Sequence, residues 1–191
     1  MSKAATLQEL SSRKLNGEGL CIGICSTKWN KEIVGALVEG CSMELKAQGV
    51  SEIVSIQVPG SYELPFGAKR LIEASNVDAV VCIGCLIKGD TMHFEYIAEA
   101  VTQGIMQLNL ETGVPVLFGV LTCLTEEQAR KRAGFGGHNH GIEWAQSVIE
   151  MASLKQRQFL PWYQRKPIQE KTALVTITTS LLYLTWIFMR K

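Results

Sequence analysis

The sequence predicts an α/β fold in which a four-stranded parallel sheet is covered by helices on both faces. Up to about residue 158, short apolar runs alternate with longer stretches whose apolar residues recur at helical spacing. One of the short runs, Ala79 to Ile87, is apolar almost throughout, as expected for a strand with both faces buried. Strands separated by helices indicate right-handed βαβ crossovers within a single sheet.

The first part of the chain supplies two strands and two helices. We expect the first strand at Leu20 to Ser26. The segment Lys31 to Gln48 follows as a helix, because its apolar residues form one stripe and Gly49 closes it. The second strand is expected at Ile53 to Val58 and the second helix at Leu64 to Ala74.

The second part continues this alternation. Thr125 and Gln128 have the spacing of a capping box, which predicts that a helix begins there. A loop rich in glycine and histidine, Gly134 to Gly141, separates this helix from the last one. The expected elements are the strand Ala79 to Ile87, the helix Phe94 to Leu110, the strand Val114 to Leu121, the helix from Thr125 to Arg132 and the helix Ile142 to Gln156.

Length and composition narrow the class of protein. A chain of 191 residues is long enough for one domain with a good core and short for two. The 19 Lys and Arg nearly cancel the 18 Asp and Glu, so no basic surplus indicates nucleic acid. Met1 to Gly19 is polar and has no apolar h-region, so we expect no secretory signal. The six cysteines are then expected to be reduced thiols in the cytoplasm.

The segment Cys82-Ile83-Gly84-Cys85 matches a C-x-x-C pattern, which can serve redox chemistry or metal binding. It lies, however, inside the apolar run that we expect to be a strand. Residues i and i+3 of a strand point to opposite faces, so the two sulfurs should diverge. We therefore expect core cysteines here.

In parallel α/β sheets, ligands bind beyond the carboxyl ends of the strands. After the first strand, Trp29 can offer a flat face to a heteroaromatic ring or pack on its own helix. After the second, Pro59-Gly60 sets a turn, and the amides that follow it face outward at a helix N-terminus. Glu63 can accept hydrogen bonds from substrate hydroxyls, or simply favour the helix dipole.

The loop after the third strand, at 87–95, combines a flexible glycine, a hydroxyl and a helix start, which suits a phosphate. His93, one turn into that helix, can exchange protons near neutral pH or have a structural role. The loop 132–141 holds two histidines, but two ligands without a cysteine do not make a metal site. We expect no metal, and interpret Arg132 and His140 as cations for a phosphate.

Taken together, three segments resemble lumazine synthases: VPGSYELP at 58–65, IKGDTMHFEY at 87–96 and RAGFGGHNHG at 132–141. The resemblance runs from about residue 15 to 158. It implies a flavodoxin-like sheet and a homopentamer, or a shell of pentamers, with active sites between subunits. It also implies condensation of 5-amino-6-(ribitylamino)uracil with 3,4-dihydroxy-2-butanone 4-phosphate, in riboflavin biosynthesis, without metal or organic cofactor. Phosphate and water would be released in this condensation.

The resemblance also implies roles for individual residues. Trp29 would stack on the pyrimidine. The amides of Ser61 and Tyr62, with the Glu63 carboxylate, would hold the ribityl chain. His93 would be the catalytic proton shuttle.

Three further positions match residues that the family places at the subunit boundary. Arg132 would bind phosphate, Phe118 would cover the ring from the next subunit, and His140, where other members have Lys, would line the pocket. The phosphate would also be held by Gly89, Asp90 and Thr91. The other expected substrate-binding residues are Asn30, Gly60, Ile87 and Lys88.

Three other functions compete with the enzyme. A flavin-binding or flavin-storage module could use the same surfaces, but would not need a titrating group such as His93. A redox flavodoxin would carry a Ser- and Thr-rich loop after the first strand, where this chain has Lys28-Trp29-Asn30. The third is a scaffold protein anchored by its C-terminus. The complete set of pocket residues favours the enzyme.

Residues 159–191 fall outside the resemblance and are expected to be a linker and hydrophobic tail, separate from the domain at 1–158. Ala173 to Met189 carries no charge and, as a helix, would span about 25 Å of a hydrocarbon layer about 30 Å thick. Lys171 and Arg190 could snorkel across the difference. The segment is therefore a candidate membrane anchor, although its alternating threonines equally predict a strand.

Overall fold

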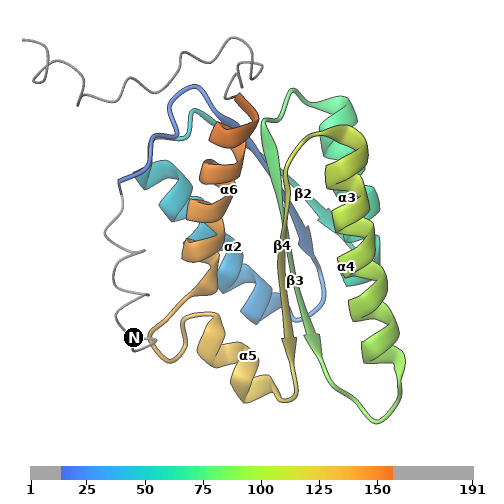
Figure 1. Ribbon diagram of the computed structural model, residues 1–191. Helices are drawn as coiled ribbons and strands as arrows, with labels where there is room; N and C mark the ends of the chain where they lie inside the picture. Colours follow the sequence, from blue (N-terminus) through green and yellow to red (C-terminus); the bar gives the residue numbers. More distant parts are fainter. Residues whose placement is uncertain (1–13, 157–191) are drawn as a thin grey trace, which may run out of the picture. The chain divides into compact units, whose positions relative to one another are not determined.

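The computed structural model describes residues 14–156, which form a four-stranded parallel sheet in the order β2-β1-β3-β4 (Figure 1). The register pairs Cys25 of β1 with Ile56 of β2 on one side and with Cys82 of β3 on the other. The strands are β1 (Cys21–Thr27), β2 (Glu52–Val58), β3 (Ala79–Ile87) and β4 (Val116–Cys123). The predicted flavodoxin-like fold class is confirmed.

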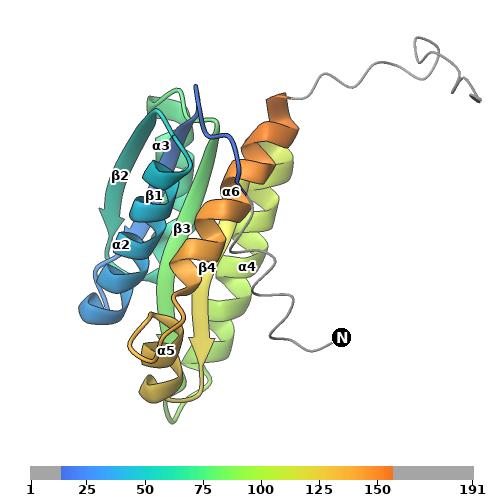
Figure 2. The same cartoon turned by 90° about the vertical axis from the view of Figure 1, so that its left-hand side faces the viewer.

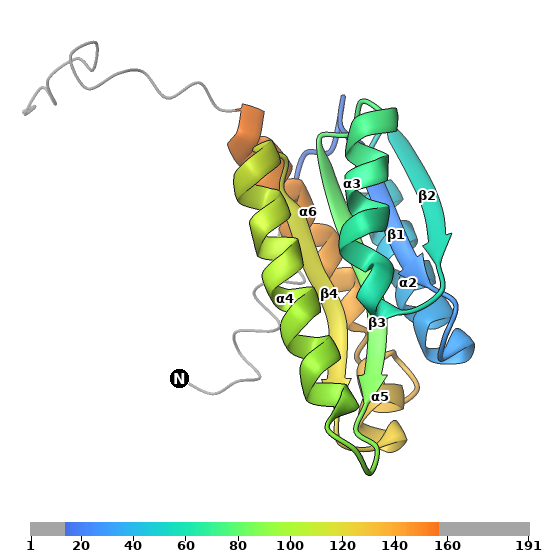
Figure 3. The ribbon, with the colours of Figure 1, turned by 90° about the vertical axis from the view of Figure 1, so that its right-hand side faces the viewer.

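Helices cover both faces of this sheet. The helices α2 and α6 lie on one face, which Figure 2 shows, and α3 and α4 lie on the other, which Figure 3 shows. The helical segments are α2 (Lys31–Ala47), the 3-10 helix η1 (Ser61–Glu63), α3 (Leu64–Ala74), α4 (His93–Thr112), α5 (Glu126–Arg132) and α6 (His140–Gln156).

Each face of the sheet has its own apolar core. On one face, Leu37 of α2 and Ile149 of α6 are buried against the strands, and on the other Leu71 of α3 and Val101 of α4 are buried. The expected divergence of the C-x-x-C sulfurs is confirmed, because Cys82 belongs to the second core and Cys85 to the first. All six cysteines are free thiols.

Two element starts differ from the expectation by two residues, and at each of them an asparagine side chain binds backbone groups. The strand β4 begins at Val116 and not at Val114, since Asn109 of α4 accepts from the Val116 N–H at 2.7 Å and donates to its carbonyl at 2.8 Å. The helix α6 begins two residues before the expected Ile142, since the Gly141 N–H donates to Asn139 Oδ1 at 2.8 Å.

Two expectations at helix starts are also corrected. His93 is the first residue of α4, and does not lie one turn inside it. The capping box is half formed: Thr125 Oγ1 accepts from the Gln128 N–H at 3.3 Å, but Gln128 Oε1 accepts from Leu124 N–H, not from Thr125. The remaining boundaries agree with the expectation within two residues.

Within residues 14–156, no helix is long and apolar enough to cross a membrane. The expected linker and tail at 159–191, including the candidate anchor at 173–189, lie outside the described residues and stay predictions.

Candidate active site

The strand order places a topological switch point between β1 and β3, because the chain passes from β1 to β2 on one side and then to β3 on the other. Ligands of open α/β sheets bind at the carboxyl ends of the strands on either side of such a point. A cleft of about 630 Å³ opens there. It brings together the expected residues Trp29, Asn30, Gly60, Ser61, Tyr62, Glu63, Ile87, Gly89, Thr91 and His93.

The loop after β1 is held by Asn30. This residue has a left-handed backbone (φ 52°, ψ 47°), which asparagine adopts more readily than most residues. Its Nδ2 donates to the Cys85 carbonyl at 3.0 Å, which ties the loop to the end of β3. Trp29, immediately before it, is 73% exposed. The indole is therefore open for stacking, and is not packed into its own helix.

The loop after β2 is a tight turn closed by Glu63. Its Oε2 accepts from the Gly60 N–H at 2.9 Å, while its Oε1 has no hydrogen-bond partner among the described residues. Ser61 is buried against β3 at Gly84, where an added Cβ would lie 2.8 Å from Ser61 Oγ. Glu63 therefore shapes the turn and still has one oxygen for a substrate hydroxyl, so the two roles considered for it are compatible.

The loop after β3 leads directly into α4. Gly89, Asp90 and Thr91 are exposed, and Thr91 Oγ1 accepts from the His93 N–H at 3.4 Å. His93 is the first residue of α4, and the first amides of a helix have no partner within it and favour an anion. The structure thus brings His93 to the helix start that the sequence analysis interpreted as a phosphate site.

Two expected residues of this loop do not line the cleft. Lys88 instead forms an ion pair with Glu95, and its Nζ lies 5.8 Å from the centre of the Phe94 ring. The ion pair, with the Lys88 side chain donating to Glu95, lowers the pKa of that carboxyl. Asp90 is exposed and is absent from the lining. The Lys88 side chain is thus held by Glu95 of α4, and Gly89 and Thr91 are the residues of this loop that line the cleft.

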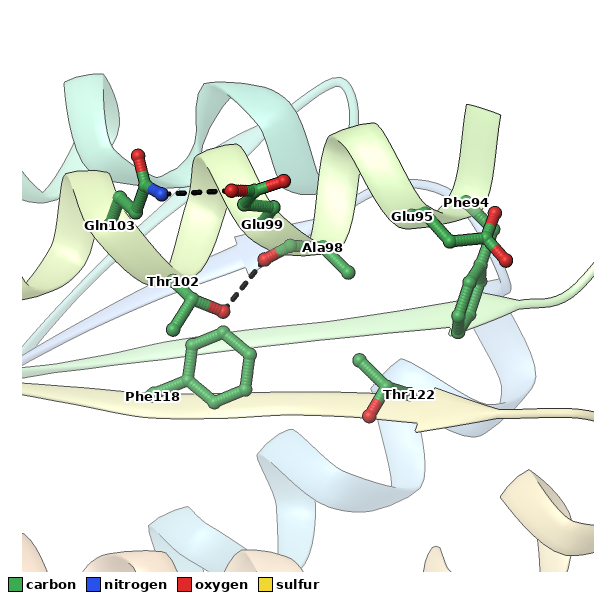
Figure 4. A pocket seen from close by; sticks show the side chains of 8 residues that line it. All are labelled: Phe94, Glu95, Ala98, Glu99, Thr102, Gln103, Phe118 and Thr122. Atoms are coloured by element: carbon green, nitrogen blue, oxygen red, sulfur yellow. Dashed lines mark hydrogen bonds between the residues drawn. The ribbon is translucent and has the colours of Figure 1, made fainter. Parts of the chain in front are cut away.

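Phe118 does not line the cleft. It projects from β4 into a separate pocket of about 540 Å³ beside α4, which Glu95, Thr102 and Thr122 also line (Figure 4). Only Phe94 borders both this pocket and the cleft. A single chain therefore does not bring Phe118 to the face of Trp29.

Arg132 and His140 are also absent from the cleft lining. Arg132 ends α5 and His140 begins α6, so they flank the loop between these helices, which an isolated bridge between Ala133 and Asn139 closes. Asn139 Nδ2 donates to the Ala36 carbonyl of α2 at 2.9 Å and so anchors this loop. Burial lowers the pKa of His140, and nearby positive charges, including that of Arg132, lower it further. The carboxylate of Glu143 acts in the opposite direction.

The cleft also contains residues that the sequence alone did not indicate. Cys85 and Leu86 lie near the carboxyl end of β3, and burial raises the pKa of the Cys85 thiol to about 12, so this thiol lines the cleft and is not a nucleophile. Ile97 lies four residues after His93 on α4 and therefore faces the same side. Helical spacing from His93 would have been the signal for Ile97.

Residues 19–156 match the family model described as 6,7-dimethyl-8-ribityllumazine synthase. The chain is 49% identical over 141 residues to the protein of that name from Schizosaccharomyces pombe, which covers 72% of this chain and 89% of that relative. It is 42% identical over 176 residues to the protein of that name from Pyricularia oryzae, covering 71% of this chain and 88% of that relative. The protein of that name from Phocaeicola vulgatus is 43% identical over 144 residues, covering 74% and 86%.

Proposed function

This chain belongs to the 6,7-dimethyl-8-ribityllumazine synthase family, and we propose that the cleft at the carboxyl ends of β1, β2 and β3 is its active site. The chain is a transferase of riboflavin biosynthesis, which condenses 5-amino-6-(ribitylamino)uracil with 3,4-dihydroxy-2-butanone 4-phosphate. One observation carries the assignment of the site: the exposed Trp29, the turn at Gly60 to Glu63 and the loop that leads into α4 border one cleft. A flavin-storage function has no comparable support.

The two substrates fit opposite ends of this cleft. The pyrimidine stacks on the exposed face of Trp29, and its ribityl hydroxyls bind the free oxygen of Glu63 and the amides of Ser61 and Tyr62. The phosphate of the ketone substrate binds the exposed loop at Gly89 and the first amides of α4. Both reacting groups then lie between Trp29 and His93.

The chemistry requires protons to move. An amine that condenses with a ketone loses its protons as water forms, and loss of phosphate requires a further proton to leave the carbon skeleton. His93 supplies the imidazole of the cleft lining, a side chain suited to both accepting and donating a proton, and it opens the helix that follows the proposed phosphate loop. We assign it as the general acid and base, with the helix amides stabilising the departing phosphate.

A single chain leaves this site incomplete. Among residues 14–156, no arginine or lysine lines the cleft to neutralise a phosphate, and Phe118, Arg132 and His140 lie outside it. We therefore propose a homo-oligomer, a pentamer or a shell of pentamers, in which the neighbouring subunit supplies these three groups. The half-buried Phe118 on the edge strand β4 is available for such a contact.

The assignment of His93 is tested by comparing His93→Ala with His138→Ala in a steady-state assay of lumazine formation. General acid–base catalysis contributes roughly 10²–10⁴-fold, so His93→Ala should lower kcat by up to that factor and leave KM nearly unchanged. His138 is exposed and outside the cleft, so its variant should retain full activity. Unchanged turnover in His93→Ala would remove this residue from the mechanism.

A further inference from the structure

Three side chains at the start of α6 bring potential metal ligands together. His138 Nε2 lies 3.1 Å from Glu143 Oε1, and His140 Nδ1 lies 2.8 Å from Glu143 Oε2. One ligand atom from each residue falls within 4.8 Å of the others. From this arrangement we infer that His138, His140 and Glu143 form a binding site for one divalent transition-metal ion of the zinc class.

The local fold explains why these groups meet. His140 and Glu143 are three residues apart on α6, so they share one face of the helix. His138 precedes the helix, and its ring packs edge-on against the ring of His140 with centroids 5.0 Å apart. The anchoring of the intervening Asn139 to α2 fixes the turn that brings His138 back over the helix. The two histidines are evident in the sequence, whereas Glu143, which completes the set, meets them only in the folded chain.

The donor set selects the class of ion. Two imidazoles and one carboxylate suit zinc, copper or nickel, whereas magnesium and calcium prefer oxygen ligands alone. Tetrahedral zinc bonds of about 2.0–2.2 Å put neighbouring donors about 3.3 Å apart. The two histidine nitrogens lie 3.1 Å and 2.8 Å from different oxygens of Glu143, and one donor from each residue lies within 4.8 Å of the others, so side-chain rotations would have to draw the three donors together around an ion. Within residues 14–156 no fourth ligand joins the group, which leaves a coordination position for water.

Two local charges oppose a bound cation. The N-terminus of α6 carries partial positive charge, and Arg132 is close enough to disfavour a positive charge on His140. The negative charge of Glu143 offsets only part of a divalent ion. We therefore expect affinity in the micromolar range and a site that fills and empties with the supply of metal.

The direct test is calorimetric titration of the untagged full chain with zinc chloride in chelator-free buffer. We expect one ion per chain. Loss of a ligand in His138→Ala or Glu143→Gln should weaken binding by roughly 10–100-fold or more, the range that even outer-shell changes reach. His93→Ala, which removes the histidine outside the cluster, should bind zinc like the wild type. No binding below millimolar zinc, or equal binding by His138→Ala, overturns the site.

A second measurement asks whether zinc at this site inhibits the enzyme. This consequence rests on the proposed function, whereas zinc binding itself does not. Zinc captures His140, which we assigned to the substrate pocket, so zinc should inhibit lumazine formation with the midpoint found for binding. His138→Ala should keep its metal-free activity and resist this inhibition. Circular dichroism melting of His138→Ala and of His138→Gln checks that each is folded. Zinc binding without inhibition would retain the metal site and contradict the role of His140 in the pocket.

Discussion

Asn139 holds the loop that presents Arg132 and His140, so its replacement should reduce both stability and activity. Its amide makes two half-buried hydrogen bonds, to the Ala36 carbonyl at 2.9 Å and from the Gly141 N–H at 2.8 Å. The same amide fills the space over Gly40, where an added Cβ would lie 2.6 Å from Nδ2. We expect Asn139→Ala to release the loop from α2.

The magnitude follows from these two contacts. Each hydrogen bond contributes about 0.5–1.5 kcal/mol, so their loss should lower the free energy of unfolding by about 2 kcal/mol. In a chain of this length about 1 kcal/mol corresponds to roughly 2–4 °C, and the melting temperature should fall by roughly 4–8 °C. Asn139→Asp keeps the acceptor for Gly141 but faces the Ala36 carbonyl with a second acceptor, so it should be destabilised comparably.

The assay is thermal unfolding at one fixed protein concentration, because assembly makes the melting temperature concentration-dependent. Asn76→Ala is the matched control, since Asn76 is exposed in the loop before β3 and should change stability by less than about 0.5 kcal/mol. Lumazine formation at a temperature where Asn139→Ala is still folded should be slower than in the wild type. Asn139→Ala that melts like the control and retains full activity would refute the anchoring role.

Three further changes test other parts of the structure. Gly141→Ala places a Cβ 2.2 Å from the Leu37 carbonyl oxygen, so it should force α2 and α6 apart and lower the free energy of unfolding by about 3 kcal/mol or more, a loss that urea denaturation would detect or reject. The hydrogen bonds from Arg130, at 2.7 and 2.9 Å, lower the pKa of Glu32 below its usual 4.5. The ion pair between Glu32 and Arg130 therefore stabilises the fold above pH 4.5, and this stabilisation is lost as the pH falls through the lowered pKa. The melting temperatures of wild type and Glu32→Gln should accordingly differ at pH 7 and converge in acid; a constant difference would contradict this linkage. Stacking of the pyrimidine on Trp29 should contribute about 0.5–1.5 kcal/mol, so Trp29→Ala should raise KM for the pyrimidine substrate roughly 2–10-fold, while Trp29→Phe stays near the wild type. Equal KM values in both variants would argue against stacking.

The sequence predicted β3 to the residue, because a strand buried on both faces appears as one continuous apolar run. The edge strand β4 was harder, since Thr122 is exposed and only Cys123 beyond it returns to the core. Its pairing with β3 extends the strand through both residues, and sequence periodicity contains no information on that partner.

The candidate site shows the same division between local and long-range effects. Trp29, the turn at Gly60 and His93 could be predicted because they directly follow strands whose positions were clear. The bond from Asn30 to Cys85 joins residues 55 apart in sequence, so no local pattern indicates it. Glu143 escaped notice as a partner of the histidines because the start of α6 was expected two residues too late.

In the proposed oligomer, two subunits complete each active site, and mixing two inactive variants tests this directly. Glu63→Ala removes a carboxylate of the cleft, whereas Arg132→Ala removes a group that lies outside the cleft of its own chain. After the two inactive proteins are dissociated together and reassembled, some interfaces should pair an intact cleft with an intact Arg132. If the site is shared, lumazine formation returns in these mixed oligomers and in neither protein alone. Mixed oligomers that form, as native mass spectrometry would show, and remain inactive would contradict it.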